Sequence, residues 1–327
     1  MNNYCLIMAG GTGRRLWPHS TVERPKQFID FFGTGRTLLQ MTYDRFRRMM
    51  PAAHIYVATH TDYADLVRRQ LPELPEANIL AESTRLSTAP AAAQASRYIR
   101  MHDAEACVIL SPADQFIVDE DRFVAEVNKA LQRLRVSAAD RFVALAVQAS
   151  HPYTSYGYIQ KGECLTPGLF RVKTFTEKPD ADFAEMFVQS DEFLWNTGLF
   201  LWHVSTLERY SSDLLEEVMV HSLDAFLLDQ HRADVLVQEC TFGWTDVGCW
   251  QRMHEASHKD VDGNVLLGQS LVLMEGCAHN TVTLQPGLKA IIKGLKGYLV
   301  ACHNGSLVIV PNTPDMDIKA LQTRLEQ

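Results

Sequence analysis

The chain has 327 residues, enough for one large domain and a smaller second one. Its net charge of −8, from 31 basic and 39 acidic side chains, argues against a general nucleic-acid-binding protein. No segment reaches the apolar length of a membrane span, no secretory signal opens the chain, and the seven scattered cysteines lack a Cys-x-x-Cys pair. Together these features predict a cytoplasmic protein with reduced thiols and no membrane partner.

Strands and helices alternate over the first 150 residues or so. The first strand is apolar throughout, as is typical of a parallel strand covered on both faces. The alternation predicts an α/β fold, a Rossmann-like open and mostly parallel sheet whose ligand lies at the carboxyl ends of the strands. We expect strands at 4–9, 54–58, 78–81, 106–110 and 142–147, and helices at 37–49, 62–71, 89–101 and 122–134.

The pattern changes in the second half of the chain. Strands are expected at 156–159, 170–175 and 193–204, with helices at 182–189 and around 205–230. From about residue 262 the chain is rich in strands and in Gly and Asn turns, up to a helix at 317–325, and we find no internal repeat. We therefore expect a main domain over residues 1–261 and a β-rich C-terminal extension over 262–327, serving as a cap or as the contact of a homodimer.

A glycine-rich loop follows the first strand and reads Ala-Gly-Gly-Thr-Gly-Arg-Arg from Ala9 to Arg15. Glycines let backbone N–H groups approach an anion closely, and the planar guanidinium of arginine donates two parallel hydrogen bonds to a phosphate. Lys26 adds a further cation shortly afterwards. We interpret this stretch as the triphosphate-binding part of a nucleotide site, although a glycine-rich loop by itself is often only a tight turn.

Two common glycine-rich motifs do not fit this loop. A P-loop requires Gly-x4-Gly-Lys-Ser/Thr, and no Gly-Lys-Ser/Thr occurs in the chain. The dinucleotide fingerprint requires Gly-x-Gly-x-x-Gly, but Leu16 stands where a third glycine should follow Gly11 and Gly13. These departures disfavour a P-loop enzyme and a dinucleotide-binding oxidoreductase.

The loop and the segment after it resemble a known family. Residues 9–18 match Ala-Gly-Gly-x-Gly-x-Arg-Leu-Trp-Pro, and Pro-Lys-Gln-Phe follows at 25–28. This is similar to the nucleotidyltransferases that join a sugar 1-phosphate to a nucleoside triphosphate. Trp-Pro and Pro-Lys-Gln-Phe resemble the mannose-1-phosphate guanylyltransferase branch in particular. The resemblance covers essentially the whole chain and implies a short form without the C-terminal isomerase domain of longer relatives.

The resemblance implies a role in nucleotide-sugar metabolism. GMP would pass from GTP to α-D-mannose 1-phosphate, giving GDP-mannose and pyrophosphate. The sugar phosphate is already a nucleophile, so the protein has to align two polyanions in line and neutralise charge with cations and with Mg²⁺ on carboxylates. The implied catalytic cations are Arg15, Lys26 and Lys178, and the implied nucleotide contacts are Ala9, Gly10, Gly11, Thr12, Gly13, Arg14, Glu82, Ser87, Thr88 and Pro112.

Carboxylates and polar residues stand where the resemblance implies a metal and a sugar. Asp114 lies just past the strand expected at 106–110, and Asp246 lies in Gly-Trp-Thr-Asp-Val-Gly. The resemblance implies that both hold Mg²⁺, whereas each taken alone is also typical of a turn or helix cap. The implied sugar-phosphate contacts are Gly157, Glu177, Lys178 and Asn196, for which a surface Glu-Lys pair and a β-bulge are the structural alternatives.

The segment expected to contact the base departs from the family pattern. In place of Glu-Pro-x-x-Arg-Asn-Thr-Ala-Pro-Ala, residues 82–91 read Glu-Ser-Thr-Arg-Leu-Ser-Thr-Ala-Pro-Ala, so that Arg85 stands one position before the usual arginine. The same chemistry with another nucleoside triphosphate or sugar 1-phosphate therefore stays open. A non-catalytic nucleotide-sugar-binding paralogue is the second alternative, and the presence of all the implied cations and carboxylates argues against it.

Overall fold

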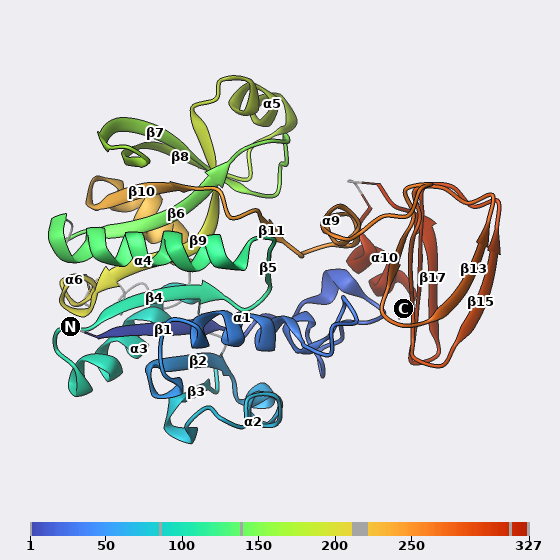
Figure 1. The fold of residues 1–327 in the computed structure, drawn as a ribbon, viewed down its shortest axis with the longest axis horizontal. Coiled ribbons are helices and arrows are strands. Elements are labelled where there is room, and N and C mark those ends of the chain that lie inside the picture. Colours follow the sequence, from blue (N-terminus) through green and yellow to red (C-terminus); the bar gives the residue numbers. More distant parts are fainter. Residues whose placement is uncertain (1, 85–86, 138–139, 211–221, 314–315, 326–327) are drawn as a thin grey trace. The chain divides into compact units, whose positions relative to one another are not determined.

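A computed structural model describes residues 2–84, 87–137, 140–210, 222–313 and 316–325 (Figure 1). The chain divides into two compact units, each made of three segments. The first unit comprises Met1–Gly10, Tyr43–Pro112 and Ile117–Trp244, and the second comprises Gly11–Thr42, Ala113–Phe116 and Thr245–Gln327.

A nine-stranded sheet, counted over the described residues, is the frame of the first unit. Its strands are β1 (Asn3–Met8), β2 (Ile55–His60), β3 (Ile79–Glu82), β4 (Cys107–Pro112), β6 (Phe142–Gln148), β7 (Gly157–Thr166), β8 (Leu169–Glu177), β9 (Phe193–His203) and β10 (Val235–Cys240). They lie in the order β3-β2-β1-β4-β9-β6-β10-β8-β7, and only β8 and β9 of these run against the common direction. This confirms the predicted α/β fold with an open, mostly parallel sheet.

Two features of this sheet were not expected from the sequence. β9 lies antiparallel between β4 and β6, so these two strands are not neighbours. An apolar strand buried on both faces carries no pattern that reveals its direction. β10 was not predicted at all, because a six-residue run of mixed apolar and polar residues cannot be told from a helix segment by its periodicity.

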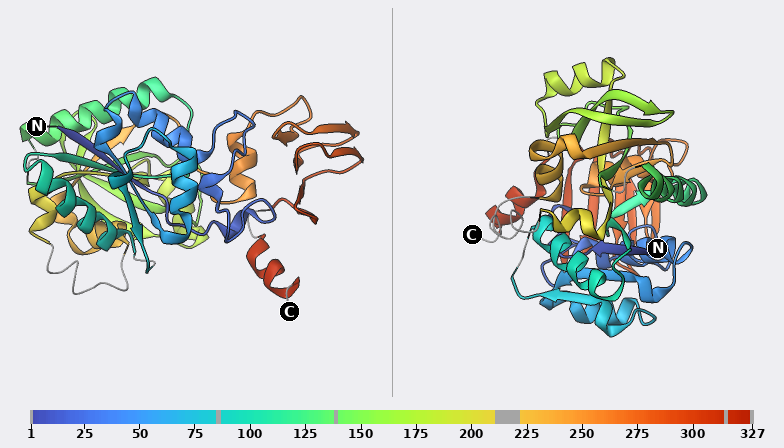
Figure 2. Two further views of the ribbon diagram at one scale, coloured as in Figure 1. Left: turned by 90° about the horizontal axis from the view of Figure 1, so that it is seen from below. Right: turned by 90° about the vertical axis from the view of Figure 1, so that its left-hand side faces the viewer.

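Helices cover both faces of the sheet. In Figure 2 (left) α4, in green, lies on one side of the strands, and α3 and α6, in teal and yellow, lie on the other. α3 packs small residues such as Ala92 and Ala95 against Leu6 of β1, and Trp202 of β9 donates its indole N–H to Ser96 Oγ at 3.0 Å. The helices are α2 (Ala64–Gln70), α3 (Thr88–His102), α4 (Glu120–Ser137), α5 (Ala181–Gln189), α6 (Val204–Glu208) and α8 (Leu223–Ala225), which a π-turn follows at Phe226–Gln230.

The remaining elements belong wholly or partly to the second unit. α1 (Leu38–Arg47) starts there, and β5 (Gln115–Ile117) pairs with β11 (Trp244–Asp246). No described helix has both the length and the apolar character that crossing a bilayer requires. The C-terminal elements are α9 (Trp250–Ala256), β12 (Val265–Leu267), β13 (Leu271–Glu275), β14 (Thr281–Leu284), β15 (Lys289–Lys293), β16 (Tyr298–His303), β17 (Ser306–Pro311) and α10 (Ile318–Leu325).

The C-terminal strands wind into a short parallel coil. β12, β14 and β16 pair in parallel, as do β13 and β15, and paired residues lie 16 positions apart for Val265 and Thr281 and 18 apart for Leu271 and Lys289. At one corner Asn280 Nδ2 donates to Asn264 Oδ1 at 2.9 Å, which stacks one turn on the next. The sequence analysis expected a β-rich segment here but not that its strands would coil, because short strands separated by turns leave no visible repeat in the sequence.

Two half-buried histidines of the second unit predict a pH-dependent stability. The rings of His19 and His303 stack with their centroids 4.8 Å apart, and His19 Nε2 lies 3.1 Å from Thr283 Oγ1. Burial, with a smaller contribution from His303, lowers the pKa of His19 from 6.5 to about 4. The unfolded chain therefore binds the proton first as the pH falls through this window, so the free energy of unfolding decreases between about pH 6.5 and pH 4.

Thermal denaturation at several pH values measures this effect. We expect the fall in Tm between about pH 7 and pH 5 to shrink by roughly 2 to 4 °C in His19→Gln, because that variant has lost the titrating ring. His258→Gln, which alters an exposed histidine of the same unit, is the matched control. An equal pH dependence of Tm in wild type and His19→Gln would contradict this explanation.

Candidate active site

The glycine-rich loop begins where β1 ends. Ala9 N donates to Ala58 O at 2.8 Å, and Thr59 Oγ1 donates to Ala9 O at 3.0 Å, so β2 holds the start of the loop in the first unit. Gly10 has only one atom within 4 Å of the place where a Cβ would stand, the amide nitrogen of His60 at 3.9 Å. The backbone at Gly10 is therefore open to an approaching ligand.

The rest of the loop lies in the second unit and is shaped by contacts with the Pro-Lys-Gln-Phe segment. Gln27 Nε2 donates to Gly11 O at 2.8 Å. Gly13 has φ 61°, and a Cβ there would lie 2.8 Å from Lys26 N, so only glycine fits. The chain then forms a 3₁₀ turn at Arg14–Leu16 that leaves the side chains of Arg14 and Arg15 exposed, as anion-binding arginines must be; Thr12 precedes this turn.

Lys26 and Asp114 form an ion pair in the second unit. Lys26 Nζ lies 2.7 Å from Asp114 Oδ2, and the exposed fractions of the two side chains are 9% and 32%. Lys26 begins a 3₁₀ turn after Pro25, while Asp114 stands between β4 and β5 as expected for a residue past a strand end. Burial of most of the lysine side chain strengthens its field at the carboxylate.

Asp246, at the end of β11, is held by its own segment. Gly248 N donates to Asp246 Oδ1 at 3.0 Å, and a Cβ at Gly248 would lie 2.9 Å from that oxygen. Arg252 of α9 forms an ion pair with the same oxygen. Burial alone would raise the pKa of the Asp246 carboxyl, but Arg252, followed by Lys26 and Arg15, lowers that pKa below its usual value. Asp246 is therefore an ionised carboxylate among cations.

The donor set at these two positions fits Mg²⁺. Both are carboxylate oxygens, and Mg²⁺ is commonly held by one or two carboxylates together with substrate phosphates rather than by a full protein cage. No group of three or more His, Cys, Asp or Glu side chains arranged for metal binding occurs in the described part of the chain. Lys26 forms an ion pair with Asp114, and Arg252 forms one with Asp246.

Three of the four candidate sugar-phosphate residues meet in the first unit. Gly157 pairs with Glu177 across β7 and β8, and a Cβ at Gly157 would lie 2.8 Å from Glu177 Oε2. Lys178 Nζ donates to Glu177 Oε1 at 2.6 Å, and Lys178 N donates to Tyr156 O at 3.1 Å. Lys178 has φ 48°, an uncommon value for a residue with a side chain, which is consistent with a functional position.

Asn196 is the fourth candidate sugar-phosphate residue. It lies at a bulge of β9, and a bulge was the structural alternative to a sugar contact at this position. Its Oδ1 accepts from Gly198 N at 3.1 Å, and its Nδ2 donates to Asp224 Oδ1 at 2.5 Å. The electrostatic influence of Glu177 and Lys178 reaches Asp224, so Asn196 belongs to the same neighbourhood as the other candidates.

The remaining candidate nucleotide contacts lie at strand and helix ends of the first unit. Glu82 and Pro112 are the last residues of β3 and β4. Ser87 is the N-cap of α3, and among the described residues its buried Oγ has no hydrogen-bond partner. Thr88 Oγ1 accepts from Leu223 N at 2.8 Å. Arg85, the candidate substitute for the usual base-contacting arginine, lies outside the described residues together with position 86.

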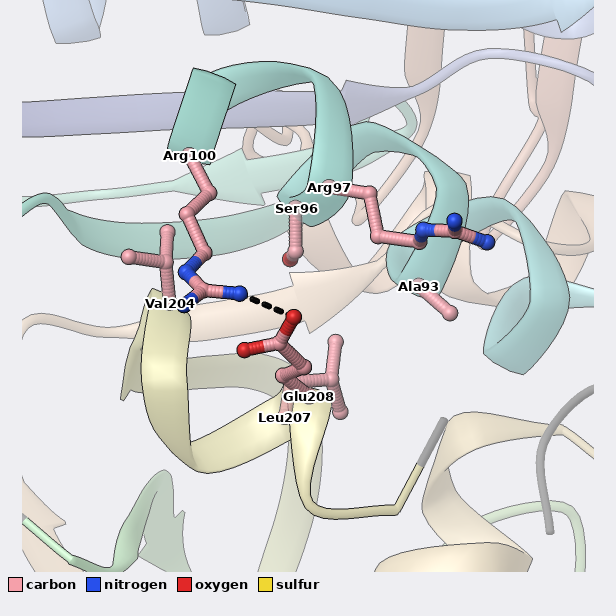
Figure 3. A pocket seen from close by; sticks show the side chains of 7 residues that line it. All are labelled: Ala93, Ser96, Arg97, Arg100, Val204, Leu207 and Glu208. Carbon is pink, nitrogen blue, oxygen red and sulfur yellow. Dashed lines mark ion pairs between the residues drawn. The ribbon is translucent and has the colours of Figure 1, made fainter. Parts of the chain in front are cut away.

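Two cavities of very different size lie in the first unit. One of about 510 Å³ is lined by residues 79–84 with Gln94 and Tyr98, and it includes the candidate Glu82. That volume is within the usual range of small-ligand sites. The other, of about 10 Å³, lies between α3 and α6, where Arg100 forms an ion pair with Glu208 (Figure 3). It has room for about one water molecule and contains no candidate residue.

The sequence model of the nucleotidyl transferase family matches residues 4–263 of this chain. The chain belongs to this family. Members of the family are nucleotidyltransferase enzymes that bind nucleoside triphosphates and sugar phosphates and generally use a divalent metal ion.

Named relatives of this nucleotidyltransferase agree with the resemblance of its motifs. Mannose-1-phosphate guanylyltransferase of Escherichia coli K12 is 30% identical and is matched over 99% of this chain and 73% of its own length. The enzyme of the same name from Klebsiella pneumoniae is 30% identical over 98% and 74%. A crystal structure described as a mannose-1-phosphate geranyltransferase from Thermus thermophilus covers 100% of both chains with a TM-score of 0.87 and 26% identity.

Two residues that contact the candidates, Arg252 and Asp224, were not expected from the sequence. Arg252 lies six residues after Asp246, on helix α9, which was not predicted from the sequence, and so Arg252 was not considered as a partner. Asp224 follows Ser222 in a pattern that reads as an ordinary helix start. The only sequence signal in each case was a charged residue, and charged residues are common enough on helices that neither stood out.

Proposed function

We propose that this nucleotidyltransferase transfers GMP from GTP to α-D-mannose 1-phosphate and releases pyrophosphate. Relatives named mannose-1-phosphate guanylyltransferase support this proposal. So do the ion pairs of Lys26 with Asp114 and of Lys178 with Glu177.

The observation that carries the proposal is the combination at the glycine-rich loop: Gly13 lies against Lys26, Arg14 and Arg15 are exposed, and Lys26 lies 2.7 Å from Asp114. An open backbone, cations and a carboxylate therefore lie together, as the phosphates of a nucleotide and a metal ion require.

In the proposed reaction a phosphate oxygen of the sugar 1-phosphate attacks the α-phosphorus of GTP in line, and the bond to pyrophosphate breaks. The exposed Arg15 and the cation of Lys26 bind the triphosphate and neutralise the charge that the leaving group carries away. Backbone N–H groups of Gly10 to Gly13 are the proposed cradle for the phosphates. No side chain has to act as a nucleophile, since the sugar phosphate supplies one.

Lys178 is proposed to bind the phosphate of the sugar, and Glu177 and Asn196 its hydroxyl groups. Asp114 and Asp246 would hold Mg²⁺, which when bound supplies positive charge to the phosphates of the nucleotide. Glu82, Ser87 and Thr88 remain proposed nucleotide contacts, with Pro112 at the end of β4. Support for Ser87 comes from its buried hydroxyl, which has no protein partner among the described residues and is therefore suited to a ligand.

Pyrophosphate release tests the proposal. Purified protein is assayed with Mg²⁺ and each of four nucleoside triphosphates crossed with mannose, glucose and N-acetylglucosamine 1-phosphates. We expect release with GTP and mannose 1-phosphate alone. Release with a different pair would retain the chemistry and overturn the proposed substrates, while tight binding of GDP-mannose without any release would favour a non-catalytic binding protein.

The variant Lys178→Ala shows which of the two substrates Lys178 binds. A hydrogen bond to a charged group contributes about 1.5 to 3 kcal/mol, so we expect the KM for mannose 1-phosphate to rise roughly 10- to 100-fold while the KM for GTP changes by less than about twofold. Lys173→Ala, on the exposed face of β8, is the matched control. A larger rise in the KM for GTP would assign Lys178 to the triphosphate instead.

Our proposals also cover the domain division, the oligomeric state and the location of the protein. We propose residues 1–261 as the catalytic domain and 262–327 as a β-rich extension, a division supported by the coil that starts at Val265. A homodimer through this extension is supported by the exposed Leu271, Leu273 and Ile291 on β13 and β15, and light scattering measures it. A cytoplasmic location is supported by the seven cysteines, which are all free thiols.

A further inference from the structure

The bulge in β9 fixes one end of the Asn196 amide. In β9, Thr197 and Gly198 stand opposite the single step from Leu145 to Ala146 in β6. Gly198 has φ 72°, and its N–H donates to Asn196 Oδ1 at 3.1 Å, while Thr197 Oγ1 donates to Leu145 O at 2.6 Å. The bulge is thus closed by hydrogen bonds, and the oxygen of the amide faces the backbone of its own strand.

Asp224 holds the other end of that amide. Its Oδ1 accepts from Asn196 Nδ2 at 2.5 Å. The N–H of Gly198 can only donate, so the amide oxygen of Asn196 has to face Gly198 and its nitrogen has to face Asp224. Asp224 is itself held in place by α8, which Ser222 caps by accepting from Ala225 N at 3.2 Å.

The carboxylate of Asp224 lies within electrostatic reach of the proposed sugar-phosphate residues. Burial raises the pKa of the Asp224 carboxyl, the hydrogen bond from Asn196 lowers it, Glu177 raises it and Lys178 lowers it. Asp224 is half-buried, and a partly desolvated carboxyl costs stability unless hydrogen bonds compensate. Groups with a shifted pKa and a specific hydrogen-bond partner are concentrated at functional sites.

We infer that Asp224 is a positioning residue for the sugar 1-phosphate, which fixes the Asn196 amide so that its second N–H is presented to a hydroxyl oxygen of the sugar. Nδ2 carries two hydrogens, and Asp224 takes one of them. Without the carboxylate, the amide could rotate and present its oxygen instead. The inference rests on the proposed function and adds Asp224 to the sugar subsite.

Steady-state kinetics of four variants test this role. We expect Asp224→Ala and Asn196→Ala each to raise the KM for the sugar 1-phosphate about tenfold, with the KM for GTP changed by less than about twofold. The KM of the double variant for the sugar 1-phosphate should not exceed that of Asn196→Ala alone, because Asp224 acts through Asn196. Asp224→Asn should recover most of the wild-type KM, since its side-chain oxygen still accepts from Asn196.

Three results would overturn the inference: effects that multiply in the double variant, a rise in the KM for GTP that equals the rise for the sugar phosphate, or no change of either KM in Asp224→Ala. Asp229→Ala is the matched control, because Asp229 is an exposed carboxylate of the following turn that also feels the charge of Glu177. It should leave both KM values unchanged.

A measurement without substrate separates this inference from the proposed function. In ¹⁵N-labelled protein the side-chain NH₂ group of Asn196 should give two widely split proton resonances, one of them shifted downfield by the hydrogen bond to Asp224. In Asp224→Ala that resonance should move upfield, and the splitting should narrow to the value of a free asparagine amide. An unchanged splitting would overturn the inference even in an active enzyme. If no substrate pair releases pyrophosphate, the proposed function fails while this spectrum still tests the Asp224–Asn196 contact.

Discussion

Asp246→Asn is expected to lower turnover by at least about a hundredfold, which corresponds to roughly 3 kcal/mol of transition-state stabilisation. Asp246 is the carboxylate that Arg252, Lys26 and Arg15 keep ionised, and its replacement removes a negative charge where the proposed Mg²⁺ binds. The measurement is kcat for pyrophosphate release as a function of Mg²⁺ concentration. The variant should need a higher concentration of the metal for half-maximal rate.

The ion pair with Arg252 complicates this variant and needs its own control. The Arg252 side chain is 5% exposed, so loss of its partner should lower the Tm of Asp246→Asn. Asp246→Asn/Arg252→Met removes both charges, and we expect it to recover part of the Tm without recovering turnover. Asp262→Asn, on an exposed turn of the same unit, is the matched control. Near-wild-type turnover in either Asp246 variant would remove this residue from the proposed metal site.

Lys26→Met is expected to lower kcat/KM for GTP by about two to three orders of magnitude. Methionine keeps most of the apolar length of the side chain, so the packing around this 9%-exposed residue is retained while the charge is lost. Asp114 then loses the cation 2.7 Å from its Oδ2. Kinetics at saturating mannose 1-phosphate, together with Tm, give the result.

Two further variants sharpen this prediction. Lys26→Arg keeps the charge but replaces a compact ammonium by a planar fork, so we expect only partial activity. Lys289→Met on the exposed face of β15 should behave as wild type. A value of kcat/KM for GTP within about tenfold of wild type in Lys26→Met would show that the lysine serves the fold through Asp114 and has no role at the triphosphate.

The sequence by itself determined the local elements and the chemistry of the loop. Alternation of apolar runs and amphipathic segments predicted the strands β1 to β4 and the helices between them, because burial on a helix or strand imposes a short period on the sequence. The glycines and cations from Ala9 to Lys26 predicted a phosphate site, since few other ligands need so open a backbone beside so much positive charge. The motifs also led to the family, which residues 4–263 match.

Only the tertiary structure decided which residues meet. Pairings between separate segments place β9 antiparallel to β4 and wind the C-terminal strands into a coil. They also bring Asn280 against Asn264. From the sequence, Asn196 could be either part of a β-bulge or a sugar contact. The structure contains the bulge, and it also shows a hydrogen bond from Asn196 to Asp224, 28 residues away. Local periodicity records whether a residue is buried, but not against which partner, and for that reason Asp224 and Arg252 became visible only in the fold.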